Sequence, residues 1–173
     1  MTDGKGEPTG RLLVANRGEI AIRICRTAAA LGITSVAVHP ADDAAGLHVR
    51  MADASVQLPG RGVAAYLDIA AVIDAARAAG ATMIHPGYGF LAENADFARA
   101  CAGAGLAFVG PSPEALALFG DKHAARRLAA AEGVPVLPGT AAPTDLEAAR
   151  DFLTGLGPGG AVMVKAVAVA CGR

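Results

Sequence analysis

Short apolar runs alternate with stretches of helical periodicity through the first 110 residues of the chain. The runs predicted as strands are 11–15, 34–39, 54–58, 82–85 and 107–109. The segments predicted as helices between them are 18–31, 43–51, 67–79 and 93–102. In the first helix the spacing places Ile20, Ile24, Ala28 and Leu31 on one face. Strands that alternate with helices indicate an α/β fold with a mostly parallel sheet.

Three polar or glycine-rich loops follow strands of this predicted sheet, at residues 16–19, 39–40 and 85–90. In parallel sheets the loops at the carboxyl ends of the strands carry the functional residues. The first loop, Asn16-Arg17-Gly18-Glu19, stands between a strand and a helix. Its polar side chains are suited equally to binding a ligand and to capping the helix.

The pattern changes after Gly110, where helices are predicted to begin after Ser112 and at Asp121. Thr144 and Glu147 have the spacing of a capping box, which predicts a helix to about Leu153. The valine-rich segment 161–169 is expected to form a strand without a partner. We therefore divide the chain into a flexible leader (1–10), a first domain (11–120) and a second, incomplete domain (121–173). Residues 11–110 are expected to fold and residues 111–173 to be loosely held.

Composition excludes several classes of protein. The net charge is −1 and there is no dense basic run, which argues against a nucleic-acid surface. No run of 18 apolar residues occurs, so we expect no membrane span, and the polar leader does not resemble a signal peptide. Cys25, Cys101 and Cys171 are scattered and form no C-x-x-C pair, which is typical of reduced thiols. These features favour the cytoplasm.

The segment Gly87–Ala92 has the G-x-G-x-x-A pattern of dinucleotide-binding loops. It follows the fourth strand rather than the first, Pro86 precedes it, and no acidic residue ends a strand about 20 residues later. A tight turn that presents Tyr88 and Phe90 is the better interpretation, with a nicotinamide-dependent oxidoreductase as an alternative. The chain contains no P-loop motif, and its four histidines show no metal-ligand spacing.

Two lysines stand out from their surroundings. Lys122 lies at a predicted helix start, where a positive charge opposes the helix dipole. Lys165 interrupts an apolar run, and a buried lysine needs an anionic partner. The two could converge on a phosphate, or they could be surface lysines whose stems lie along apolar surface.

Two long segments, Leu13–Ile24 and Ile84–Asn94, closely resemble the biotin carboxylase family. This family includes the carboxylase subunits of acetyl-CoA, propionyl-CoA and pyruvate carboxylases. Phe108–Pro111 and Gly120–Lys122 resemble the same family, and the similarity extends from residue 11 to about residue 166. The resemblance implies a Rossmann-like pre-ATP-grasp domain with a parallel sheet, followed by an incomplete start of an ATP-grasp fold.

The resemblance also implies roles for individual residues. Lys122 and Lys165 match two lysines that contact the phosphates of ATP in the family. Tyr88, with the flanking Gly87 and Gly89, matches a loop on the biotin side of the active site. No catalytic residue and no metal ligand is assigned to this chain.

Members of the family use ATP and Mg²⁺ to join bicarbonate to biotin on a carrier. The resemblance therefore implies a biotin carboxyl carrier protein or domain and a carboxyltransferase subunit as partners. Arg23 and Arg26 match a helix near the family's dimer interface, which implies a possible homodimer.

The similarity stops after Met163–Ala166, where the family has a glycine-rich lid followed by Arg-Gly-Met. Here the chain continues as 167–173 and ends. We therefore expect a biotin carboxylase fragment that is inactive alone and binds none of the cofactors tightly. The alternative is a non-catalytic module that binds a partner carboxylase through the Arg23 face. Another ATP-grasp ligase, such as a carbamoyl-phosphate synthetase relative, is disfavoured by the two long segments.

Overall fold

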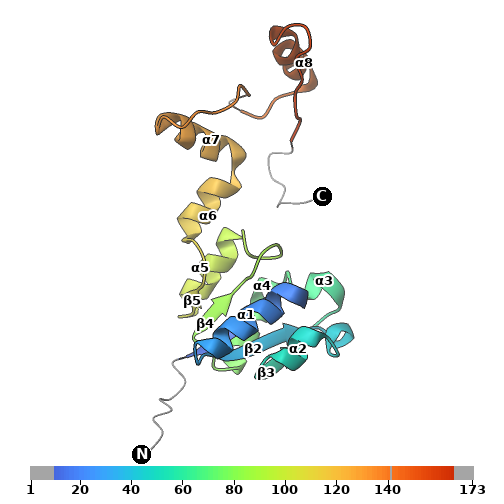
Figure 1. Cartoon of the computed structure of the whole chain (residues 1–173), viewed down its shortest axis with the longest axis vertical. Helices are drawn as coiled ribbons and strands as arrows, with labels where there is room; N and C mark the ends of the chain where they lie inside the picture. Colours follow the sequence, from blue (N-terminus) through green and yellow to red (C-terminus); the bar gives the residue numbers. More distant parts are fainter. Residues whose placement is uncertain (1–9, 141, 166–173) are drawn as a thin grey trace, which may run out of the picture. The chain divides into compact units, whose positions relative to one another are not determined.

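The computed structural model describes residues 10–140 and 142–165, and the chain divides into one compact unit up to Leu116 and a second from Ala117 onward (Figure 1). The helices and strands in chain order are β1 (Arg11–Val14), α1 (Gly18–Ala30), β2 (Thr34–His39), the 3-10 helix η1 (Ala41–Asp43), α2 (Leu47–Met51), β3 (Ala54–Gln57), α3 (Gly62–Ala65), α4 (Ile69–Ala78), β4 (Met83–His85), α5 (Ala95–Gly103), β5 (Ala107–Phe108), α6 (Pro113–Gly120), α7 (Lys122–Ala131) and α8 (Leu146–Gly155).

The first unit is built on a five-stranded sheet with the order β3-β2-β1-β4-β5. Every neighbouring pair of these strands is parallel. The central strand β1 pairs with β2 (Leu12 opposite Ser35) and with β4 (Leu12 opposite Met83). All five predicted strands and the predicted α/β class with a parallel sheet are therefore confirmed.

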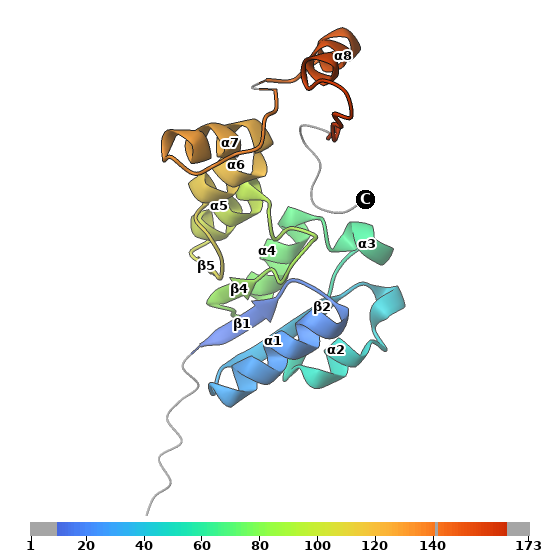
Figure 2. The ribbon, with the colours of Figure 1, turned by 45° about the horizontal axis from the view of Figure 1, so that its top comes forward.

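Helices cover both faces of the sheet, which explains why β1 is apolar at successive positions (Figure 2). Leu12 and Val14 pack with the buried face of α1, which includes Ile24. Leu13 and Ala15 point to the opposite face, into the larger core with α4 and α5. Side chains alternate across a strand, so a strand that is buried on both faces reads as a continuous apolar run.

Local capping explains where three predicted elements differ from the structure. Leu31 is 65% exposed, because α1 ends at Ala30 and Leu31 is already its C-cap. The predicted helix 43–51 is interrupted by Gly46, which becomes the N-cap of α2. The predicted cap Thr144 is wrong, because the neighbouring carboxylate of Asp145 accepts the hydrogen bond from Ala148 N that caps α8.

The expected strand at 161–169 is wrong for its described part. Residues 161–165 have no regular secondary structure and are exposed, and residues 166–169 lie outside the described residues. A strand requires hydrogen bonds to a neighbouring strand, and the described residues of the second unit contain no strand that could provide them. The predicted leader, apart from Gly10, and Cys171 also lie outside the described residues.

No helix in the described ranges is both long enough and apolar enough to cross a membrane.

Candidate functional site

The loops after β1 and β4 leave the sheet at the point where its strand order reverses. The chain runs outward from β1 through β2 to β3, and then returns to the other side of β1 with β4 and β5. In open parallel sheets, ligands bind in the crevice beyond the carboxyl ends of the strands at this switch point. The loops 15–19 and 85–90 therefore occupy the position where a binding site is expected.

The side chain of Asn16 ties these two loops together. Its Nδ2 donates hydrogen bonds to the backbone carbonyl oxygens of Pro86 (2.7 Å) and Tyr88 (2.8 Å). Its Oδ1 accepts from Arg17 N at 2.8 Å. The side chain is buried, with 3% of the residue exposed, and both amide hydrogens are used. Asn16 therefore neither caps α1 nor faces solvent, and instead connects loops about 70 residues apart.

Backbone conformation adapts the second loop to Asn16. Gly87 has φ of 70°, and a Cβ added there would lie 2.7 Å from Asn16 Nδ2. Only glycine accommodates both the left-handed conformation and this close approach. Phe90 has φ of 42°, which is uncommon for a residue with a side chain. Its ring stacks on that of Tyr66, with centroids 5.3 Å apart and planes 6° from parallel.

A cluster that sequence reasoning missed lies behind this stack. Tyr66 OH donates to Asp43 Oδ2 at 2.8 Å, and Arg17 Nε lies 3.4 Å from the same oxygen. The Arg17 guanidinium also lies 5.9 Å from the centre of the Tyr66 ring. Burial, and then the hydrogen bond to Asp43, raises the pKa of Tyr66. The acidic pair after His39-Pro40, at the end of the second strand, was the only sequence signal for this cluster.

An open pocket lies beside the two loops. It has a volume of about 470 Å³ and is lined by Asn16, Arg17, Gly18, Glu19, Ile20, Val63, Tyr88, Gly89 and Phe90. The Tyr88 hydroxyl donates a hydrogen bond to Glu19 Oε1. This hydrogen bond, and then partial desolvation, raises the pKa of Tyr88. Tyr88 is nevertheless 61% exposed, so the phenol remains accessible to a ligand.

The segment Gly87–Ala92 does not have the geometry of a dinucleotide-binding loop. That fingerprint requires glycines that open a helix, so that the helix N-terminus faces the pyrophosphate. Here α5 begins at Ala95, after a further turn, and its N-cap is Asn94. The nicotinamide alternative has no structural support.

His85 ends β4 and holds the start of the 85–90 loop. Gly87 N donates to His85 Nδ1 at 3.0 Å, which requires that this nitrogen carry no proton. Burial lowers the pKa of His85. Burial also lowers the pKa of His48, whose Nε2 has no hydrogen-bond partner among the described residues. Burial therefore favours the neutral form of both imidazoles.

This arrangement predicts that the first unit loses stability as the pH falls from about 7.5 to about 5.5. A lowered pKa means that the unfolded chain binds protons that the folded chain excludes, so the stability is present above the ordinary histidine pKa and is lost below it. The decline should be shallower in His85→Asn, whose side-chain oxygen can still accept from Gly87 N. Urea unfolding at several pH values measures both slopes, and equal slopes would contradict the assignment to His85.

The structure places both predicted phosphate-binding lysines in the second unit. Lys122 is exposed at the first position of α7, directly after the N-cap Asp121. Lys165 is exposed in a segment without regular secondary structure, so the expectation that it interrupts a buried strand is wrong. Their convergence on a phosphate stays a prediction.

The described part of the chain contains no cluster of metal-binding side chains. In residues 10–140 and 142–165, no three histidine, cysteine, aspartate or glutamate side chains gather where they could hold a metal ion. Mg²⁺ is bound through carboxylate oxygens and phosphates. We therefore derive no step through the metal from these residues.

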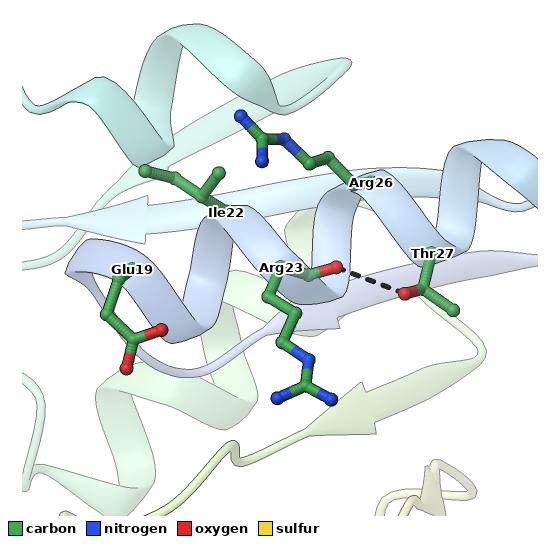
Figure 3. Close-up of a pocket in the computed structure, with 5 residues that line it drawn as sticks. All are labelled: Glu19, Ile22, Arg23, Arg26 and Thr27. Atoms are coloured by element: carbon green, nitrogen blue, oxygen red, sulfur yellow. Dashed lines mark hydrogen bonds between the residues drawn. The ribbon is translucent and has the colours of Figure 1, made fainter.

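The outer surface of α1 carries Arg23 and Arg26, beside a shallow depression also lined by Glu19, Ile22 and Thr27 (Figure 3). The two guanidinium groups extend on different sides of the helix. Thr27 Oγ1 donates to the backbone oxygen of Arg23 at 3.2 Å. Within the described ranges neither arginine has an ion-pair partner.

Comparison with known proteins agrees with this geometry. Residues 8–116 match the model of the biotin carboxylase N-terminal domain. Human pyruvate carboxylase is 49% identical over 150 residues, which cover 84% of this chain and 13% of the human protein. A putative urea carboxylase of Emericella nidulans is 54% identical over 129 residues, covering 75% of this chain and 10% of that protein.

Solved structures show the same relationship. The biotin carboxylase domain of a single-chain bacterial carboxylase superposes with a TM-score of 0.83 at 61% identity, covering 86% of this chain and 35% of that chain. A 2-oxoglutarate carboxylase biotin carboxylase domain dimer from Hydrogenobacter thermophilus, in complex with MgADP and bicarbonate, gives 0.83 at 38% identity, over 88% of this chain and 34% of that one. The chain thus spans about a third of these structures. Both long sequence segments reach the switch point of the sheet, and the family model matches more than half of the chain. This chain therefore belongs to the biotin carboxylase family and contains its N-terminal domain.

Proposed function

We propose that the chain serves as the N-terminal part of an ATP-dependent biotin carboxylase, which forms carboxybiotin from ATP, bicarbonate and carrier-bound biotin. The observation that carries this proposal is the junction made by Asn16. It joins the two loops that contain the family's long sequence segments, at the switch point where the fold places ligands.

Tyr88, Gly87 and Gly89 form the biotin side of this proposed site. The exposed phenol of Tyr88 and the small residue Gly89 line an open pocket, which suits a flat, neutral ring with polar edges. Biotin supplies the nitrogen that becomes carboxylated, and the protein's part here is to present the ring. These residues are proposed to contact and orient the biotin ring, and none of them is assigned a proton transfer.

Lys122 and Lys165 are proposed to contact the ATP phosphates. Both side chains are exposed cations, as required for a site that neutralises phosphate charge. Phosphoryl transfer also requires that a metal ion neutralise phosphate charge. We also propose that the 173-residue chain is inactive alone and binds ATP and biotin weakly, because it spans about a third of the solved biotin carboxylase structures.

Membership of the biotin carboxylase family also suggests the partners of the chain. The carboxybiotin product requires a biotin carboxyl carrier protein or domain, and a carboxyltransferase subunit would consume it. The surface of α1 that carries Arg23 and Arg26 is proposed as a homodimer contact, and a dimeric solved relative supports this. The alternative, a non-catalytic module that binds a partner carboxylase, would use the same surface.

A chimeric enzyme tests the proposed activity. Residues 11–140 of this chain replace the corresponding segment of the single-chain bacterial biotin carboxylase domain, which is 61% identical. We expect the chimera to release ADP from ATP in a manner that depends on both bicarbonate and biotin. The 173-residue chain alone should release no more ADP than a sample without protein.

The control is the unmodified bacterial domain, assayed at the same concentration. A chimera that folds, as judged by its circular dichroism, but shows no biotin-dependent ADP release would count against the proposal. It would favour the non-catalytic module, and binding to a partner carboxylase would then be measured directly.

A further inference from the structure

We propose that Asn16 is the positioning residue of the Tyr88 loop: its amide fixes the Pro86–Tyr88 backbone, and this places the Tyr88 side chain at the pocket beside α1. The predicted effect on biotin binding rests on the proposed function. The contacts of Asn16 are observed in the structure and do not depend on that function.

The hydrogen bonds of Asn16 are specific to an amide. Nδ2 has two hydrogens, and the carbonyl oxygens of Pro86 and Tyr88 accept one each. These two carbonyls lie on either side of Gly87, so a single side chain fixes the backbone around the left-handed glycine. Because Asn16 is buried, water does not readily replace these bonds, and their loss leaves polar groups unsatisfied.

Glu19 then fixes the side chain that the loop carries. Its carboxylate accepts the hydrogen bond of the Tyr88 hydroxyl across the pocket. This contact joins the loop at residue 88 to the first turn of α1. The segment 16–19 thus contacts the 85–90 loop in two ways. Asn16 binds the backbone of the loop, and Glu19 binds the Tyr88 side chain.

The chain offers a closely matched control for this proposal. Asn16→Asp preserves the shape and the Oδ1 acceptor for Arg17 N, but it replaces the double donor with an oxygen that faces two carbonyls. Asn94 is the only other asparagine, and it uses only its oxygen, accepting from Phe97 N at 2.9 Å. Asn94→Asp therefore makes the same chemical change without losing a structural hydrogen bond.

Tyrosine ionisation in the full 173-residue chain provides the measurement. The chain contains two tyrosines and no tryptophan, so labelling the tyrosine ring carbon Cζ with ¹³C gives two NMR signals. Tyr88→Phe assigns them. In the natural chain, the contact with Glu19 holds the pKa of Tyr88 above its ordinary value, and burial raises the pKa of Tyr66. The Tyr66 signal therefore reports that the first unit is folded.

We expect the pKa of Tyr88 in Asn16→Asp to fall back toward the ordinary tyrosine value of 10.0, with the Tyr66 signal unchanged. Asn94→Asp should behave as the natural chain. A folded Asn16→Asp chain that keeps the raised pKa of Tyr88 overturns the proposal. If Asn16→Asp unfolds, Gly87→Ala disturbs the same contact from the loop side and is read in the same way. Loss of the Tyr66 signal in both variants assigns Asn16 to folding and also overturns the proposal.

The chimera adds a functional measurement. There, Asn16→Asp should raise the KM for biotin about tenfold and leave the KM for ATP unchanged. Equal increases in both constants would indicate general damage and overturn the positioning role. If the chimera lacks activity before any substitution, the proposed function fails, but the tyrosine measurement still decides the role of Asn16.

Discussion

Amide hydrogen exchange should separate the chain into a strongly protected first unit and a second unit that exchanges almost freely. The backbone amides of β1 and β2 belong to strands that are buried on both faces. By contrast, α7 and α8 have ten residues each and contain no buried residue. Isolated helices of this length are marginal in water, since their stability in proteins comes mainly from packing.

The expected contrast is at least about a thousandfold in protection, because amides in the core open only with global unfolding, which costs about 5–15 kcal/mol in a domain. Mass spectrometry or NMR measures it on the full chain. A chain shortened after Gly120 is the control, and its β1 and β2 amides should exchange as slowly as before. Equal protection of α1 and α7 would show that the second unit is independently stable.

Phe97→Ala is expected to lower the stability of the first unit strongly. Phe97 is completely buried in α5, and its ring packs edge-on against Phe108, with centroids 5.8 Å apart. Phe97→Ala removes this aromatic contact and leaves a cavity, which costs about 3–5 kcal/mol. This is a large part of the stability of a domain of this size.

Urea unfolding followed by circular dichroism measures the effect. Leu31→Ala is the matched control, because Leu31 is also a large apolar residue but is 65% exposed beyond the end of α1. Its cost should stay within about 0.5 kcal/mol. A loss below about 1 kcal/mol for Phe97→Ala would mean that the core rearranges to fill the space.

The elements that could be predicted from sequence are those whose local pattern and tertiary environment agree. The strand 34–39 has the predicted bounds, because a β-branched apolar run suits a strand covered on both faces. Leu31 continued the helical periodicity, but helix termination at Gly32 decided its exposure. The apolar run at 161–165 could not be interpreted alone, because a strand depends on a partner elsewhere in the fold.

The candidate site was predictable in its loops but not in its contacts. The loops 16–19 and 85–90 could be identified because each directly follows a predicted strand, and the carboxyl ends of parallel strands lie at one edge of the sheet. The sequence did not show that β1 and β4 are neighbours, so the bond between Asn16 and the Tyr88 carbonyl was hidden. The stack of Phe90 on Tyr66 was also hidden, because the sequence did not show that the end of α3 lies beside the loop after β4.

The central position of β1 has a consequence for the synthesis of the chain on the ribosome. β1 is synthesised before the other four strands, and one of its two neighbours is β4. Leu12 can pair with Met83 only after residue 83 has been synthesised. At about 5–20 residues per second, those 71 intervening steps take about 4–14 seconds. Until β4 is made, the backbone groups of β1 on that edge have no partner and its side chains are apolar, so this strand is where a chaperone or a mispaired neighbour would first act.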